Sequence, residues 1–307
     1  MRPTPNPRPW RTWRPLALIL AAGLLVDAPA LAVGLNQMET HAEKNTVGSD
    51  TDTAPVGGDI VLSEYHGAYA SARLDAGRRS VYVESIGDGN HVTQQYRSTA
   101  ALRAGYTLWN TLENRALTFN EASGLTLAFD LRLRGDLSVP TSSDVAVVNM
   151  GTMGFTASVT GGSGTAQLAG DYTAVWHAPS QYTLSQHLVP SGTQSVVVGG
   201  SWLTGPVSSA ELTFSLAHSG GATGLLFMHV QSSAAKEAHS VFDLDLMDVH
   251  LAQGSYAGLA VRFDSGGMVM GVSTIPEPLP SALLLSGLAV VAGVARRRGG
   301  YQSNNPA

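Results

Sequence analysis

The chain has 307 residues, with 18 Lys and Arg against 23 Asp and Glu, and its formal net charge at pH 7 is −5. This balance excludes a nucleic-acid-binding surface, because such surfaces neutralise phosphates with an excess of Lys and Arg. The chain has no cysteine, so an exported form would contain no disulfide and would depend on a packed core, for which the chain is long enough.

The N-terminus has the three parts of a secretory signal peptide. The first 14 residues contain four arginines and no acidic residue, and residues 16–26 (LALILAAGLLV) are all apolar. Ala30 and Ala32 provide the small-x-small pattern of a cleavage site. We therefore predict a signal peptide over residues 1–32, cut after Ala32. The alternative is an uncleaved anchor, but the apolar stretch is short for a membrane span.

The predicted mature chain, residues 33–275, is more acidic than the whole. The two segments outside it contain seven of the 18 basic and two of the 23 acidic residues, which leaves 11 basic against 21 acidic residues and a net charge of −10. Its first part, residues 33–58, is polar and rich in Asp, Thr and Gly. This composition predicts a flexible N-terminal segment.

From residue 59 onward, short apolar runs alternate with Gly, Ser, Asn and Asp, which is typical of many β-strands. The clearest strand is residues 125–134 (LTLAFDLRLR), where every second residue is apolar, and residues 211–218 (ELTFSLAH) repeat the pattern. Such alternation indicates one buried and one solvated face. Further strands are expected at residues 80–84, 91–96, 145–148, 172–176, 194–198 and 258–263.

No long segment shows helical periodicity. Residues 98–104 and 232–239 fit one or two helical turns and fit a loop equally well. Glycine-rich segments between strand-like runs are expected to form hairpin turns. We therefore predict an all-β fold over residues 59–274, an antiparallel β-sandwich of jelly-roll-like topology.

One strand contains both a predicted irregularity and a candidate metal site. In residues 242–251 (FDLDLMDVHL) the apolar positions alternate with Asp243 and Asp245, and then the phase slips by one residue near Met247. One extra residue in a strand predicts a β-bulge there. Asp243 and Asp245 would project from one face and could hold a calcium ion. The alternative is a solvated strand face on an acidic domain.

The candidate catalytic motifs lack their partners. Ser233 and Lys236 match the Ser-x-x-Lys motif of penicillin-recognising enzymes, but the other motifs of those enzymes do not occur. The nine histidines form no His-x3-His pair and no His-Glu-x-x-His motif. We therefore predict no catalytic residue and no enzymatic activity.

Two groups of residues fit sugar binding. Residues 64–69 (EYHGAY) bring a carboxylate, an imidazole and two phenols together, and Trp109, Trp176 and Trp202 could stack on sugar rings. The alternative places the three indoles in the core or at the rim of the sandwich.

The C-terminal segment, residues 275–298 (IPEPLPSALLLSGLAVVAGVARRR), has three parts in order. The first is the triplet Pro276, Glu277 and Pro278, which should be extended and exposed because proline disfavours the helical conformation before it. The uncharged residues 279–295 follow. As a helix they would be about 25 Å long, at the short end of a transmembrane span. Arg296, Arg297 and Arg298 would then hold the short tail, residues 299–307, in the cytoplasm.

This tail resembles the PEP-CTERM sorting signal of Gram-negative bacteria, which has the same three parts in the same order. The resemblance implies that signal peptidase and the secretion machinery export the chain. The C-terminal helix then anchors it transiently in the cytoplasmic membrane, and an exosortase cleaves it near the triplet. It also implies a place at the outer cell surface, linked to exopolysaccharide. The residues after the arginines depart from the usual pattern, and an ordinary single-span tail anchor is the alternative.

The sequence thus favours an exported, exosortase-processed surface or extracellular-matrix protein with a non-enzymatic β-sandwich, associated with exopolysaccharide. A carbohydrate-binding module is the first alternative, and a secreted hydrolase is the second.

Overall fold

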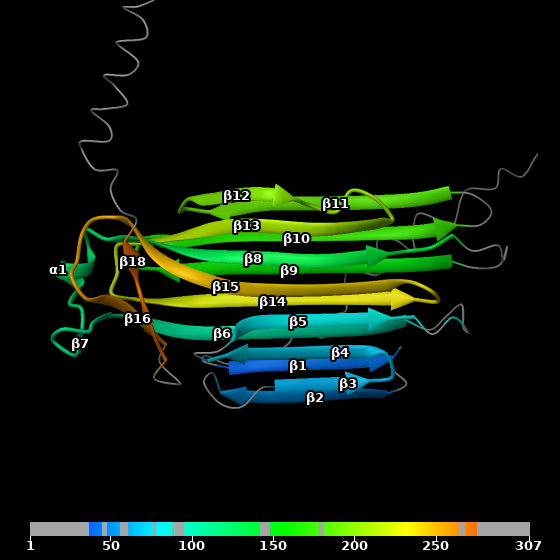
Figure 1. Ribbon diagram of the computed structural model, residues 1–307, viewed down its shortest axis with the longest axis horizontal. Coiled ribbons are helices and arrows are strands. Elements are labelled where there is room, and N and C mark those ends of the chain that lie inside the picture. Colours follow the sequence, from blue (N-terminus) through cyan, green and yellow to red (C-terminus); the bar gives the residue numbers. More distant parts are fainter. Residues whose placement is uncertain are drawn as a thin grey trace, which may run out of the picture. The chain divides into compact units, whose positions relative to one another are not determined.

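The computed structural model describes residues 37–44, 48–55, 61–75, 78–87, 89, 95–141, 148–177, 181–263 and 268–274. These residues form strands β1 to β18 and one short helix, and the strands make two sheets packed as a sandwich (Figure 1). The prediction of an antiparallel β-sandwich is confirmed. No helix among these residues is long and apolar enough to cross a bilayer. The predicted signal peptide and the predicted helix at 279–295 lie outside the described residues.

Sheet A has the strand order β11-β10-β9-β14-β6-β1-β2, and three short strands extend it beside β6. Its strands are β1 (Gln37–Lys44), β2 (Gly48–Pro55), β6 (Gln95–Asn110), β7 (Arg115–Ala116), β9 (Val148–Gly161), β10 (Gly164–His177), β11 (Gln181–Gly192), β14 (Thr223–Ala235), β16 (Leu259–Phe263) and β17 (Val269–Gly271).

Sheet B has the order β12-β13-β8-β15-β5-β4-β3, with β18 beside β15. Its strands are β3 (Val61–Tyr65), β4 (Ala68–Leu74), β5 (Arg79–Ile86), β8 (Thr126–Ser138), β12 (Val196–Ser201), β13 (Val207–Ser219), β15 (His239–Gln253) and β18 (Ser273–Thr274). Strands β11 and β12 form one lateral edge of the sandwich, and β2 and β3 form the other (Figure 1).

Helix α1 (Phe119–Ala122) is one turn held by its cap. Thr118 and Glu121 form a capping box, and the Arg115 guanidinium donates to both carboxylate oxygens of Glu121, at 2.9 and 2.7 Å. These hydrogen bonds, with that of Arg115 the largest, lower the pKa of Glu121. A single turn is unstable alone, so the cap and this ion pair fix the connection from β7 to β8.

The core lies between the sheets and follows the alternation in the sequence. On β8, Leu127, Phe129, Leu131 and Leu133 are all at most 1% exposed, while Asp130 and Arg132 between them are only partly buried. Each such side chain contributes about 1.5–3 kcal/mol when fully buried. The cluster extends over strands of both sheets, so one continuous core supports the cysteine-free domain.

The prediction of a flexible segment at residues 33–58 is wrong for residues 37–44 and 48–55, because β1 and β2 form a hairpin there. All eight residues of β1 also pair with β6, and Met38 and Ala42 are fully buried. The polar composition hid this strand. Two of its four buried residues, Glu39 and Thr40, are polar, and the neighbouring strand that orders it is more than 50 residues away in sequence.

The two ambiguous segments are also strands. Residues 98–104 form the middle of β6, where Ala100, Leu102 and Ala104 are fully buried. Residues 232–239 contain the end of β14, a turn at Lys236 with φ of 58°, and the first residue of β15. Burial between paired strands overrides the helical preference of alanine here.

The predicted bulge is confirmed. The pairing of β15 with β8 is regular up to Leu246, and it shifts by one residue between Leu246 and Asp248. Met247 is the extra residue and is 44% exposed. After the shift, Val249 again faces the core and is fully buried, so the bulge restores the apolar phase.

Gly135 of β8 lies directly under an aromatic ring of the core. A Cβ atom at this position would overlap the Phe242 ring and would lie 2.8 Å from Met153 Cε. Phe242 itself stacks on Trp202, with ring centroids 5.8 Å apart and an interplanar angle of 15°. The ring therefore has no free direction in which to move.

We expect Gly135→Ala to lower the free energy of unfolding by about 1–3 kcal/mol, because the added methyl overpacks the core. Urea denaturation of the variant and the wild type measures this change. Gly271→Ala is the matched control, since a Cβ there has no heavy atom within 4 Å. Equal stabilities for the two variants would contradict the packing of Gly135 under Phe242.

Candidate functional site: the outer face of sheet B

A charged ladder crosses the outer face of sheet B between β8 and β15. Asp243 and Asp245 project from the same face, and their register partners on β8 are Arg134 and Arg132. Arg134 Nη2 lies 2.8 Å from Asp243 Oδ2 and 3.3 Å from Asp245 Oδ2, while Arg132 Nη2 lies 3.0 Å from Asp245 Oδ2. Opposite charges on adjacent strands stabilise the pairing of the strands.

The local environment opposes the ionised form of Asp243. Burial raises the pKa of Asp243, the negative charge of Asp245 raises it further, and Arg134 lowers it. Asp243 Oδ1 is buried and has no hydrogen-bond partner among the described residues. Arg132 Nε is buried without a hydrogen-bond partner among these residues as well, so the ladder is incompletely satisfied on both of its strands.

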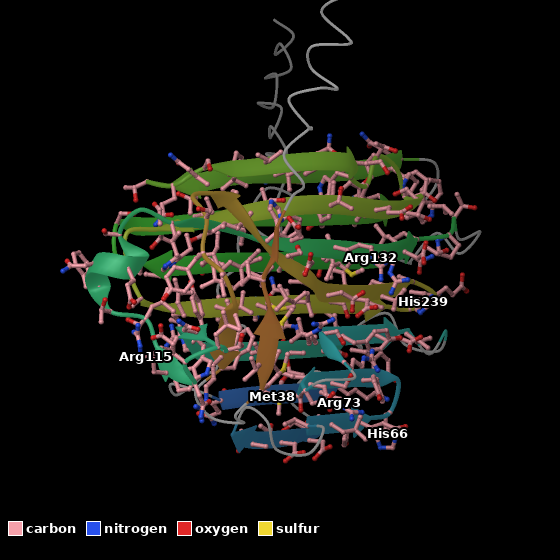
Figure 2. The ribbon with its side chains drawn as sticks, turned by 60° about the vertical axis from the view of Figure 1, so that its left-hand side comes forward. Met38, His66, Arg73, Arg115, Arg132 and His239 are labelled. Carbon is pink, nitrogen blue, oxygen red and sulfur yellow. The ribbon has the colours of Figure 1, made fainter. Side chains whose placement is uncertain are left out.

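The ladder continues onto β5. Tyr82, which pairs with Asp243 in register, donates its hydroxyl hydrogen to Glu84 Oε2 at 3.0 Å. Burial and this hydrogen bond raise the pKa of Tyr82. His239 Nε2 lies 3.0 Å from Glu84 Oε1. Figure 2 labels Arg132 and His239, two side chains of this face. Each arginine of the ladder thus lies beside an aspartate of opposite charge.

The geometry of the predicted calcium pair favours ion pairs with arginine. The two aspartates share a face, as predicted, but their Oδ2 atoms already accept hydrogen bonds from guanidinium groups. The described part of the chain contains no group of three or more His, Asp or Glu side chains placed around a common point. A calcium ion needs six to eight oxygen ligands, so it would have to displace the arginines and recruit water.

A second polar cluster lies where β13, β8 and β15 meet beside the bulge. Ser215 Oγ donates to Asp130 Oδ1, and His250 Nδ1 lies 2.7 Å from Asp130 Oδ2. The carboxylate therefore stands between the serine and the imidazole. In a nucleophilic triad the imidazole stands between the other two and takes the proton from serine. This order supplies no base to Ser215.

An open hollow of about 350 Å³ adjoins this cluster. The outward residues of β12 and β13 line it, together with Asp130 and Met247. Val197 of β12 is 67% exposed beside it. The phase slip at Met247 was the one signal in the sequence for this hollow, because the bulge turns that side chain outward.

Two histidines, the buried His218 and the partly buried His229, have a lowered pKa. His218 lies between the sheets, where Nε2 donates to the Gly221 carbonyl and Nδ1 accepts from the Tyr106 hydroxyl, each at 2.9 Å. Burial lowers the pKa of His218 and raises that of Tyr106. His229, on the outer face of sheet A, has its pKa lowered to about 4 by burial. Both imidazoles are therefore neutral at pH 7.

The three tryptophans have different positions. Trp176 is 6% exposed and packs against Tyr182, and Trp202 packs between Phe155 and Phe242. Trp109 lies half-buried on β6, with the Arg262 guanidinium 4.6 Å from its ring centroid. Trp176 is in the core, and Trp202 is partly buried with an aromatic ring on each of two sides, so Trp109 is the better placed of the three indoles for stacking with a ligand.

The other candidate residues do not assemble into a site. Residues 64–69 form the β3–β4 hairpin, where Tyr65 packs inward against the small cluster around Tyr96. Ser233 lies on β14 and hydrogen bonds to Thr152 Oγ1 and to Gln95 Nε2, so the helix required by the Ser-x-x-Lys chemistry is replaced by a strand. The signal-peptide cleavage residues Ala30 and Ala32 and the sorting-signal residues Pro276, Glu277, Pro278, Arg296, Arg297 and Arg298 lie outside the described residues.

Family models, curated proteins and solved structures were each compared with this chain, and none matches it. The polar ladder and the hollow are therefore interpreted from their own geometry.

We expect millimolar calcium to leave the melting temperature of the wild type unchanged relative to EDTA, because arginine already neutralises both aspartates. A ligand that binds the folded state would raise the melting temperature. Differential scanning calorimetry of the wild type and of Asp243→Asn makes the measurement. A calcium-dependent rise in the wild type that Asp243→Asn abolishes would establish a calcium site instead.

Proposed function

We propose that this chain is an exported, exosortase-processed surface or extracellular-matrix protein whose β-sandwich is non-enzymatic and associated with exopolysaccharide. The supporting observation is the fit between the sandwich and the predicted cleavage points. Strand β1 begins at Gln37, and four residues separate it from the cut after Ala32. Strand β18 ends at Thr274, and one residue separates it from Pro276. Neither predicted cut would remove a described strand.

The core supports the same proposal. It extends from Met38 near one predicted cut to Met270 near the other, and it contains residues of both sheets. A domain that loses its terminal segments after export must retain its stability without them. Because the core residues of the described part of the chain all lie between the two cuts, neither processing step would remove any of them.

For the finer topology we infer a jelly-roll-like winding. Strand β14 lies between β6 and β9 in sheet A, and β13 lies next to β8 in sheet B. The antiparallel pairs β6–β14 and β8–β13 thus bring late strands back beside early ones in both sheets. This is the feature that two nested Greek keys produce.

The resemblance assigns the working residues of this proposal. An exosortase would recognise the triplet from Pro276 to Pro278, and the residues 279–295 would hold the chain in the inner membrane until cleavage. Arg296, Arg297 and Arg298 would stop transfer on the cytoplasmic side. The released sandwich, with a net charge of −10, would then act outside the cell.

We expect Glu277→Ala to leave the full-length chain in the membrane, if the enzyme recognises the acidic residue of the triplet. Intact mass spectrometry of membrane and medium fractions from the native host measures this. The wild type should begin at Val33 and end near Pro276. Glu211→Ala, an exposed change on β13, is the control and should be processed normally. A wild-type chain that still contains Arg296 would support a simple tail anchor.

A carbohydrate-binding module is the alternative proposal, and Trp109 with Arg262 is the observation that favours it. Indole and guanidinium groups are the types of group that bind sugar rings and acidic sugars. We expect the released protein to bind acidic exopolysaccharide fragments on a glycan array, and Trp109→Ala to weaken that binding. An array without signal would remove this alternative. The hydrolase alternative has no comparable support, since Asp130 separates Ser215 from His250.

A further inference from the structure

The two lateral edges of the sandwich are built differently. At one edge, Asp50 and Asp52 of β2 pair in register with the buried residues Ala42 and Thr40, so their side chains point toward the inner side of sheet A. Asp50 Oδ2 accepts the backbone N–H of Glu64 at 3.0 Å, and Asp52 Oδ2 accepts that of Leu62 at 3.2 Å. These carboxylates occupy the free donors of edge strand β3.

Inward-pointing charges of this kind prevent a second sheet from adding to an edge. Any strand that approached β3 would have to displace two charge-assisted hydrogen bonds, and it would meet the acidic side chains of β2. This edge of the sandwich is therefore closed within the molecule.

The opposite edge has no inward-pointing Asp or Glu. Residues 172–210 contain no Asp, Glu, Lys or Arg, and they include both edge strands, β11 and β12. Strand β12 (VVVGGS) has no proline, and it pairs in regular register with β13 alone. Alternate N–H and C=O groups of such a strand point away from the sheet. They have no protein partner among the described residues.

The side chains at this edge are apolar and exposed. Val198 pairs with buried Phe214 and Leu184 pairs with buried Ala174, so both point toward the inner side of their sheets. They are nevertheless 38% and 44% exposed. Val197 on the outer side is 67% exposed. These apolar side chains at an unpaired sheet edge are available for contact with a further strand.

We propose that β12 pairs antiparallel with β12 of a second copy of this chain across a two-fold axis, so that sheet B continues through both molecules. The distribution of charge along the chain favours a second copy as the partner of β12. Copies of a chain with a net charge of −5 at pH 7 repel each other. Residues 172–210 are the stretch where two copies meet without like charges opposed. A two-fold contact uses the same strand on both sides and therefore stops at a dimer.

Disulfide trapping in the full chain tests this pairing, because the natural chain has no cysteine. Val197→Cys, Val198→Cys and Gly199→Cys are made one at a time, and a Cβ at Gly199 would lie 3.6 Å from Thr213 Oγ1, an ordinary contact. We expect mild oxidation to give a reducible species of twice the chain mass for at least one of them. Leu62→Cys, on the closed edge and 41% exposed, is the matched control and should stay monomeric.

A charge at the edge provides the second measurement. Val197→Lys, or Gly199→Lys where Val197→Cys is the variant that crosslinks, should abolish the dimer when added to the crosslinking variant, because two ammonium groups would face each other near the axis. Both positions are exposed, so the fold is retained, and circular dichroism checks this. Thr53→Lys on β2 is the control and should leave the dimer unchanged. Absence of any dimer, equal crosslinking through Leu62→Cys, or an adduct with another mass would each overturn the proposal.

Discussion

The alternation of apolar and polar residues along the long strands is the constraint on which the rest of the molecule depends. A chain without cysteine can hold two sheets together only through the side chains between them. A slip of one residue in β15 would turn its whole apolar set from the core to the solvent. The bulge at Met247 shows the constraint directly. It adds one residue on the outer side, and Val249 returns to the core.

The same constraint explains what could be predicted from the sequence. Residues 125–134 and the bulge in residues 242–251 were predictable because a period of two over ten residues is a local signal. Strand β1 was not, since two of its four buried residues are polar and its order comes from pairing with distant β6. Residues 98–104 were missed because their small apolar residues carry helical propensity, and only tertiary burial decides between the two structures.

The candidate site was also predictable only in part. That Asp243 and Asp245 share a face follows from their spacing, and the structure agrees. That Arg134 reaches Asp243 does not follow, because the two residues are 109 positions apart in the chain and only the register of β8 with β15 brings them together. The Ser215–Asp130–His250 cluster likewise comes from three strands. Contacts between side chains of different strands therefore cannot be predicted until the strand register is known.

The lateral edges of the two sheets differ in how their backbone groups are satisfied. An inward-pointing carboxylate is costly unless it finds donors, and Asp50 and Asp52 find them in the unpaired N–H groups of β3. The two carboxylates and the two unpaired N–H groups thus satisfy each other through hydrogen bonds. At β12 there is neither a charge nor a capping group, so its outward backbone groups can be satisfied by water or by another strand. Water cannot cover Val198 and Leu184 favourably, whereas a strand can, and this difference favours association at that edge.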